Sequence, residues 1–159
     1  MSPIEIIEAT SAKDFAAGRT LIEEYAAALG IDLCFQNFSE EIASLAKVYG
    51  PPRGCLLLAR KDGKSMGCVA VRDTEETVCE MKRLYVKPQY RRVGIGRLLA
   101  ETAIARARQF HYSRIVLDTL PSMTKARFLY ESLGFREIKG YYQNPLHGVR
   151  YLELVLVAQ

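Results

Sequence analysis

The residue types best suited to chemistry cluster in one short segment between a predicted strand and a predicted helix. The segment reads Arg91-Arg92-Val93-Gly94-Ile95-Gly96-Arg97. Its two glycines let backbone N–H groups face a ligand without obstruction by side chains. A helix that starts here adds unpaired N–H groups and the positive end of its dipole. The segment therefore predicts a phosphate-binding loop, and the alternative is a glycine turn with solvated arginines.

Two better-known phosphate motifs fit this segment less well. A P-loop is excluded because this segment holds no Gly-Lys-Ser or Gly-Lys-Thr and does not match the pattern GxxxxGK[ST]. A dinucleotide site gains support from Asp118, which lies 24 residues after Gly94. However, Leu99 occupies the third glycine position of that motif, and residues 87–92 form a longer loop than its tight turn. A dinucleotide-binding protein stays open as an alternative.

A second motif follows on another predicted helix. It reads Ala126-Arg127-Phe128-Leu129-Tyr130-Glu131-Ser132-Leu133-Gly134-Phe135. In this order, the two motifs resemble those of the GNAT superfamily of acyl-CoA-dependent N-acetyltransferases. Arg91, Gly94 and Gly96 meet that family's signature, (Gln/Arg)-x-x-Gly-x-(Gly/Ala). The resemblance covers roughly residues 54–157.

The resemblance implies a fold, a cosubstrate and a reaction. The fold would be one α/β (α+β-like) acetyltransferase domain over residues 1–159, with about four helices beside a mixed, mostly antiparallel sheet. That sheet would splay between its fourth and fifth strands and leave a cleft there. The cosubstrate would be acetyl-CoA, with no metal. The chain would transfer the acetyl group to a primary amine of a small molecule or a protein, by direct attack in a ternary complex.

The resemblance also implies which residues bind acetyl-CoA. The pyrophosphate would lie on the backbone amides of residues 92–97, and the pantetheine arm would pair with the strand before them. A backbone N–H near Leu84 or Tyr85 would stabilise the oxyanion. The implied cofactor-binding residues are Leu84, Tyr85, Val86, Arg91, Arg92, Val93, Gly94, Ile95, Gly96 and Arg97.

Two side chains are the candidate catalytic residues. Tyr130 matches the family tyrosine that protonates the departing thiolate, although it also fits a buried aromatic on the apolar face of its helix. Glu80 matches a position at which several family members carry the general base; its alternative is a salt bridge to Lys82 or Arg83. His147 or an ordered water are the other candidates for the base.

Other residues are expected around the acceptor. Asp118 is predicted to end its strand, and its alternative role is to face the substrate. Arg83 is a candidate partner for an acceptor carboxylate. The loop that holds Tyr141, Tyr142 and Asn144 borders the acceptor pocket in this family. One departure concerns Met123, which stands where many members have a CoA-binding asparagine; a thioether cannot supply that hydrogen bond. Backbone contacts, Ser122 or Lys125 would replace it.

Charge and composition limit the classes of function. The 159 residues carry a net charge of +4, but residues 80–114 alone hold nine bases and two acids, which favours an anionic ligand. The apolar stretches are too short to span a membrane, and the first residues lack the pattern of a signal peptide. Four separate cysteines indicate reduced thiols and a cytoplasmic protein rather than disulfides or structural zinc.

The apolar periodicity and the turn residues predict the elements that position these groups. A strand at Ile4–Ile7 precedes a helix at 12–29 that is capped by Ser11 and stopped by Gly30, and Ser39 would cap a helix to Val48. Asp62-Gly63 predicts a hairpin. The remaining elements are strands at 55–59, 66–71, 78–86, 114–117 and 151–157, a helix at 94–110 with Leu98, Leu99, Thr102, Ala103 and Ala107 inward, and a helix at 123–133 capped by Ser122 and stopped by Gly134.

Two rival functions remain. A non-catalytic acyl-CoA sensor would keep the phosphate-binding loop without turnover. A nucleic-acid binder would use the basic segment, but Tyr85 and Tyr90 are too few for a stacking surface and no nucleic-acid-binding motif occurs. We expect no nucleic-acid or membrane partner. The oligomeric state stays open, and the final strand is a candidate for pairing across a homodimer.

Overall fold

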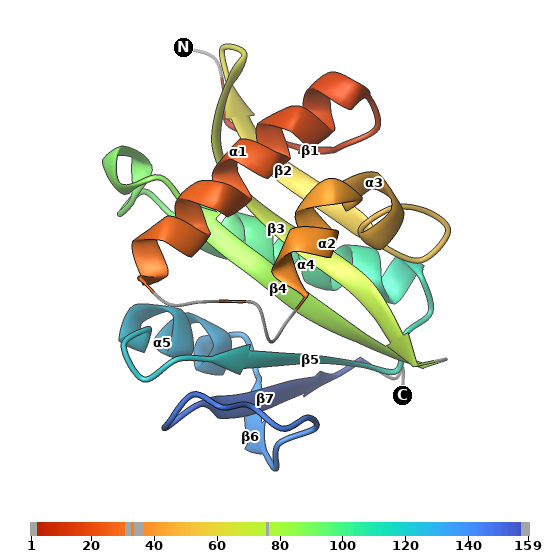
Figure 1. Ribbon diagram of the computed structural model, residues 1–159, viewed down its shortest axis with the longest axis vertical. Helices are drawn as coiled ribbons and strands as arrows, with labels where there is room; N and C mark the ends of the chain where they lie inside the picture. The colour runs from red at the N-terminus through yellow and green to blue at the C-terminus, as the bar shows by residue number, and fades with distance from the viewer. Residues whose placement is uncertain (1–2, 31–32, 34–36, 76, 157–159) are drawn as a thin grey trace.

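One seven-stranded sheet organises the chain (Figure 1). The computed structural model describes residues 3–30, 33, 37–75 and 77–156. All neighbouring strands are antiparallel except β4 and β5, so the expected mixed, mostly antiparallel sheet is confirmed. In spatial order the strands are β1 (Glu5–Glu8), β2 (Cys55–Lys61), β3 (Lys64–Glu75), β4 (Val78–Val86), β5 (Arg114–Thr119), β7 (Arg150–Val155) and β6 (Arg136–Ile138).

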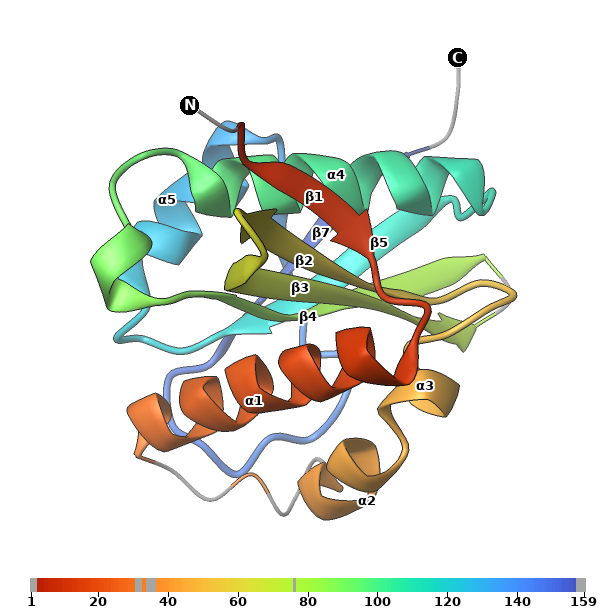
Figure 2. The same ribbon diagram turned by 90° about the horizontal axis from the view of Figure 1, so that it is seen from above.

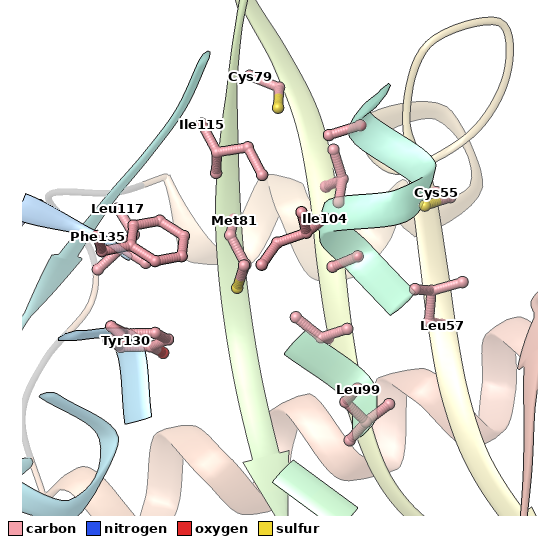
Figure 3. Packing of buried hydrophobic residues seen from close by; sticks show 14 of the residues in the cluster. Cys55, Leu57, Cys79, Met81, Leu99, Ile104, Ile115, Leu117, Tyr130 and Phe135 are labelled. Carbon is pink, nitrogen blue, oxygen red and sulfur yellow. The ribbon is translucent and has the colours of Figure 1, made fainter. Parts of the chain in front are cut away.

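Helices cover both faces of the sheet (Figure 2). One face carries α1 (Ala12–Leu29), α2 (Phe38–Ala43) and α3 (Leu45–Val48), and the other carries α4 (Ile95–Gln109) and α5 (Thr124–Ser132). A short 3-10 helix, η2 (Pro88–Tyr90), follows β4. The sheet therefore separates two apolar clusters, one under α1 and one under α4. Figure 3 shows the second cluster, which includes Leu99 and Ile104 of α4 and Tyr130 of α5.

The sheet opens between β4 and β5, as the resemblance implied. Their parallel ladder covers only Val78–Glu80, and β4 then continues to Val86. The register between β3 and β4 shifts near Arg83, whose φ of 61° is in the left-handed region. Such a bulge bends a strand and raises its local twist. The bulge therefore lies in the part of β4 that has left β5, three residues after Glu80.

Several local predictions are confirmed. Ser11 and Asp14 form a capping box at the start of α1, and Gly30 ends that helix with a φ of 65°. Asp62 and Gly63 both have positive φ, as a two-residue type I′ hairpin requires. Gly134 follows α5 with a φ of 101°. These sites combine a turn residue with a periodic apolar segment, which is why sequence alone located them.

Three helix predictions are wrong. Ser39 is not a cap, because α2 begins at Phe38 after Asn37 and the predicted helix breaks at Ser44 into α2 and α3. Ser122 does not cap α5: Leu120 and Met123 close a turn around it with a 2.9 Å backbone hydrogen bond. Leu98 is 37% exposed, because the buried face of α4 is formed by Ile95, Leu99, Ala100, Ala103, Ile104 and Ala107.

Strand ends also differ from the prediction. β5 runs to Thr119, so Asp118 is inside this strand. β7 lies between β5 and β6 over Tyr151–Glu153, so the expected pairing of the final strand across a dimer is wrong for these residues. Val157 lies outside the described residues.

The described residues also bear on the membrane, metal and thiol expectations. In this part of the chain, no helix combines the length and the apolar composition that a membrane crossing needs. Within the same residues, no three His, Cys, Asp or Glu side chains are grouped so as to hold a metal ion. Cys55, Cys68 and Cys79 are buried free thiols, and burial raises the pKa of each. Cys34 lies outside the described residues.

Candidate active site

The loop between η2 and α4 has the geometry of an anion-binding turn. Gly94 precedes the helix with a φ of 87°, and Arg92 has a φ of 71°. The side chain of Ile95 is buried, so this residue offers a ligand only its backbone. A Cβ built on Gly96 would meet no heavy atom closer than 3.9 Å. The first turn of α4 therefore presents backbone N–H groups on an open surface.

The arginines of this loop differ in how they are held. Arg91 donates from Nε to the carbonyl oxygen of Val86 at 2.8 Å, which fastens the loop to the end of β4. Arg97 donates to the hydroxyl of Ser132 at 2.7 Å and so links α4 to α5. Arg92 is exposed, as is Val93 beside it. All three guanidinium groups keep the surroundings of the loop positive.

A small cavity of about 60 Å³ lies where β4 separates from β5. Leu84 of β4, Asp118 of β5 and Tyr130 of α5 line it together. Tyr85, by contrast, turns its side chain toward α1, where its hydroxyl lies 3.4 Å from Glu24 and its ring meets Tyr25. The opening between the strands thus leads from the anion-binding loop to a polar cavity.

Tyr130 is buried at the edge of this cavity, with 8% of its surface exposed. Its ring packs edge-to-face on Phe135 with centroids 5.6 Å apart, and both are labelled in Figure 3. None of the described residues hydrogen-bonds its hydroxyl. Burial raises the pKa of Tyr130 well above its ordinary value, so the hydroxyl keeps its proton at neutral pH. Tyr130 can therefore be both a buried aromatic residue of the core and a proton donor.

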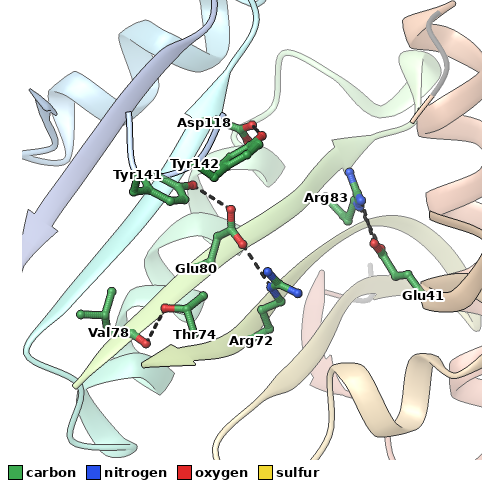
Figure 4. Close-up of polar contacts among 9 residues, drawn as sticks. All are labelled: Glu41, Arg72, Thr74, Val78, Glu80, Arg83, Asp118, Tyr141 and Tyr142. Carbon is green, nitrogen blue, oxygen red and sulfur yellow. Dashed lines mark hydrogen bonds and ion pairs between the residues drawn. The ribbon is translucent and has the colours of Figure 1, made fainter. Parts of the chain in front are cut away.

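Glu80 lines a second, larger cavity of about 360 Å³. Figure 4 shows the carboxylate of Glu80 between Arg72 and Tyr141. Arg72 of β3 donates to its Oε1 at 3.1 Å, and the hydroxyl of Tyr141 donates to its Oε2 at 2.7 Å. Glu80 as a residue is 4% exposed. The salt bridge to Lys82 or Arg83 that the sequence suggested is wrong, because neighbouring strands bring Arg72 opposite Glu80.

Lys82 joins the two cavities, since it lines both of them. It is half-buried, and burial lowers its pKa, with a further contribution from the charge of Arg83. In the sequence, Lys82 is one base of the basic segment and a candidate salt-bridge partner of Glu80. Its spacing of two residues from Glu80, which puts both side chains on one face of β4, was the available signal.

Arg83 already forms an ion pair within the protein, so the predicted contact with an acceptor carboxylate is wrong. Its guanidinium is buried and paired with Glu41 of α2. Figure 4 shows this pair on the same face of the sheet as Glu80.

The loop after β6 closes the site from the other side. Tyr142 donates a hydrogen bond to Asp118, and Asn144 donates to the hydroxyl of Tyr142 at 2.8 Å. Asn144 and Asp118 line the small cavity, and Tyr141 and Tyr142 line the larger one, so the loop borders both as expected. His147 is exposed and lines neither cavity. Met123 lines the small cavity through a side chain without a donor.

A splayed α/β sheet with an anion-binding loop beside a polar cleft has the parts that an acyl-CoA-dependent acyltransferase needs. Residues 19–135 match the Acetyltransferase (GNAT) family. The chain belongs to this family, and it is an acyltransferase of the GNAT type.

Two relatives that match this chain over nearly their whole length are named N-acetyltransferases. An uncharacterised N-acetyltransferase of Schizosaccharomyces pombe is 41% identical over 96% of this chain and 95% of its own length. One from Dictyostelium discoideum is 32% identical over 96% and 99%. N-acetylaspartate synthetase of Xenopus tropicalis is 41% identical over 55% of this chain, which is only 32% of that protein.

Solved structures share the fold. An acetyltransferase from Streptococcus agalactiae has a TM-score of 0.78 and 27% identity, covering 96% of this chain and 98% of that one. A Salmonella typhimurium protein solved with acetyl-CoA has a TM-score of 0.71 at 19% identity, covering 99% of this chain and 96% of that one, and it shows a shared fold alone.

Proposed function

We propose that this chain transfers the acetyl group of acetyl-CoA to a primary amine by direct attack in a ternary complex. The observation that carries the proposal is the opening of β4 from β5 between the anion-binding loop and the cavity with Tyr130. The relative named N-acetylaspartate synthetase is named for an N-acetylated amino acid, which supports a small-molecule acceptor.

The described residues fit acetyl-CoA in shape and in charge. The backbone of residues 92–97 would hold the pyrophosphate, with the open space at Gly96 allowing close approach. Beyond Glu80, the backbone of β4 has left its ladder with β5, so Leu84, Tyr85 and Val86 would hold the pantetheine arm. When bound, acetyl-CoA supplies an activated acetyl group and a thiolate leaving group. Arg91 and Arg97 fix the loop through their own contacts with β4 and α5.

Three tasks remain for the protein. Glu80 would take the proton from the acceptor ammonium, directly or across one water, because only the neutral amine attacks. A backbone N–H near Leu84 or Tyr85 would stabilise the oxyanion. Tyr130, whose hydroxyl stays protonated at neutral pH because burial raises its pKa, would donate its proton to the thiolate as CoA departs. Glu80 and Tyr130 line adjoining cavities that share Lys82, as the two ends of one reaction require.

Thiol release from acetyl-CoA across a panel of amines tests the proposal. We expect turnover with at least one class of small amine and a lower kcat in Glu80→Gln, with a changed pH profile. Tight acetyl-CoA binding without turnover on any small amine or peptide amine would instead indicate an acyl-CoA sensor.

A further inference from the structure

One of the cations that line the larger cavity has no carboxylate partner among the described residues. Glu75 also lines this cavity, but it is exposed and makes no ion pair with this cation. Two carboxylates near Lys82 already have arginine partners: Glu80 pairs with Arg72, and Glu41 pairs with Arg83. Lys82 makes no ion pair with any residue that the structure describes. A half-buried ammonium of this kind is costly to the protein unless a ligand compensates it.

Asp118 does not change this conclusion. It lines the small cavity with Lys82, but its carboxylate accepts hydrogen bonds from Tyr142 and from Asn144, the latter at 3.4 Å. Arg114 also lines the larger cavity, and its guanidinium pairs with Glu153 at 2.8 Å. Among the described cationic side chains that line the larger cavity, Lys82 is therefore the one without a carboxylate partner.

The position of Lys82 fits a substrate contact. It lines both cavities, so an anionic group bound to it lies at the junction between the larger cavity and the cleft of Tyr130. A volume of about 360 Å³ is within the range of small-molecule sites. Glu80 and Lys82 leave the same face of β4 two residues apart and so present one negative and one positive group to this space.

We infer that Lys82 binds the carboxylate of the acceptor, and that the acceptor is an α-amino acid. This inference rests on the proposed function, and it specifies the substrate class of the same site. In a free α-amino acid, the amino group and the carboxylate are on one carbon atom. When the carboxylate lies on Lys82, the amino group lies beside Glu80 and the cleft. A single ammonium matches the single charge of a carboxylate.

The test compares free α-amino acids with their carboxamides and with the corresponding decarboxylated amines. The wild type is expected to favour the free acid by about 10- to 100-fold in kcat/KM, as for a hydrogen bond to a charged group. Lys82→Met removes that preference mainly through KM for the acid, and leaves kcat/KM for the carboxamide near its wild-type value. Lys82→Arg keeps part of the preference. Lys13→Met, a matched change at an exposed lysine of α1, keeps all of it.

The outcomes separate the two proposals. If the wild type acetylates carboxamides or phosphorylated amines at least as well as free amino acids, the assignment of Lys82 is overturned and the proposed function stands. The assignment also fails if Lys82→Met lowers kcat/KM equally for acid and carboxamide. If no amine is acetylated although acetyl-CoA binds, the proposed function is overturned and this inference with it. Melting temperatures and acetyl-CoA affinity of the variants establish that each is folded.

Discussion

Arg83 of β4 donates two hydrogen bonds to the carboxylate of Glu41 of α2, from Nε to Oε2 at 2.8 Å and from Nη2 to Oε1 at 2.7 Å. The two residues are 5% and 6% exposed. A planar guanidinium and a carboxylate match in this geometry, and each offsets the desolvation of the other. Because Arg83 is the residue with positive φ at the bulge, the pair fixes α2 to the part of β4 that has left β5.

Glu41→Gln should strongly destabilise the protein, because it leaves the guanidinium of Arg83 buried without a counterion. The expected loss in the free energy of unfolding is about 3 kcal/mol, measured by urea denaturation at neutral pH. Glu40→Gln, on the same helix but exposed, is the control and should change stability little. Replacing both partners, as Glu41→Leu with Arg83→Met, should recover much of the loss; a further loss in the double variant would contradict this account.

The same pair should make stability depend on pH. Burial raises the pKa of Glu41, but the hydrogen bonds and charge of Arg83 outweigh it, so the pKa is lowered from 4.5. A carboxyl whose pKa is lower in the folded state contributes stability above its unfolded pKa and loses it as the pH falls. The stability difference between wild type and Glu41→Gln should therefore shrink below pH 4.5. A difference that stays constant down to acid unfolding would rule out this linkage.

Gly96→Asp, with Gly96→Ala as its matched control, tests whether the loop binds acetyl-CoA. A Cβ on residue 96 meets nothing closer than 3.9 Å, and an alanine is favoured by roughly 0.5–1 kcal/mol over glycine within a helix. Gly96→Ala should therefore keep or raise the melting temperature and keep the Kd for acetyl-CoA near its wild-type value, since the family signature allows alanine at this position. In Gly96→Asp the carboxylate repels the pyrophosphate, so the Kd should rise steeply. Calorimetric titration measures the Kd, and wild-type affinity in Gly96→Asp would show that the loop does not hold the cofactor.

Tyr130→Phe should lower kcat by about 10²- to 10⁴-fold, the usual contribution of a general acid, with little change in acetyl-CoA affinity. The substitution keeps the ring that packs on Phe135, so the core should survive. Thiol-release assays measure kcat, titration with acetyl-CoA measures the affinity, and thermal unfolding measures the stability of the core. Phe135→Leu changes the same packing without removing a hydroxyl, and an equal loss of kcat in both variants would assign Tyr130 to packing alone.

Sequence predicted the parts of this structure that depend on local pattern. The strand at Val78–Val86, the hairpin at Asp62-Gly63 and the helix cap at Ser11 each combine a periodic apolar run with a specific turn or cap residue. The predicted caps at Ser39 and Ser122 were wrong. A serine before an apolar run is a frequent cap, but the adjoining turn decides which residue precedes the helix.

Pairings across elements were not predictable from spacing alone. The partners of Glu80 and Arg83 come from β3, the loop after β6 and α2, and only the folded sheet brings these segments together. For the same reason, the sequence could not show that Lys82, one base among nine and a candidate partner of Glu80, makes no ion pair with the described residues while Arg72 and Arg83 have partners.

Lys82→Met should stabilise the protein in the absence of acceptor. Burial lowers the pKa of Lys82, which means that the folded state pays a desolvation cost for its charge at neutral pH. Methionine keeps much of the apolar stem and removes that cost, so the melting temperature should rise. As the pH increases toward the unfolded pKa of 10.5, the folded wild type loses this proton before the unfolded chain does, so the stabilities of the wild type and the variant should converge.

A saturating α-amino acid should stabilise the wild type more than Lys82→Met, because only the wild type offers the carboxylate a cation. Thermal unfolding with and without amino acid measures both effects, with Lys13→Met as reference; a variant that is less stable than wild type at neutral pH would show that Lys82 is a structural residue rather than one kept for the substrate.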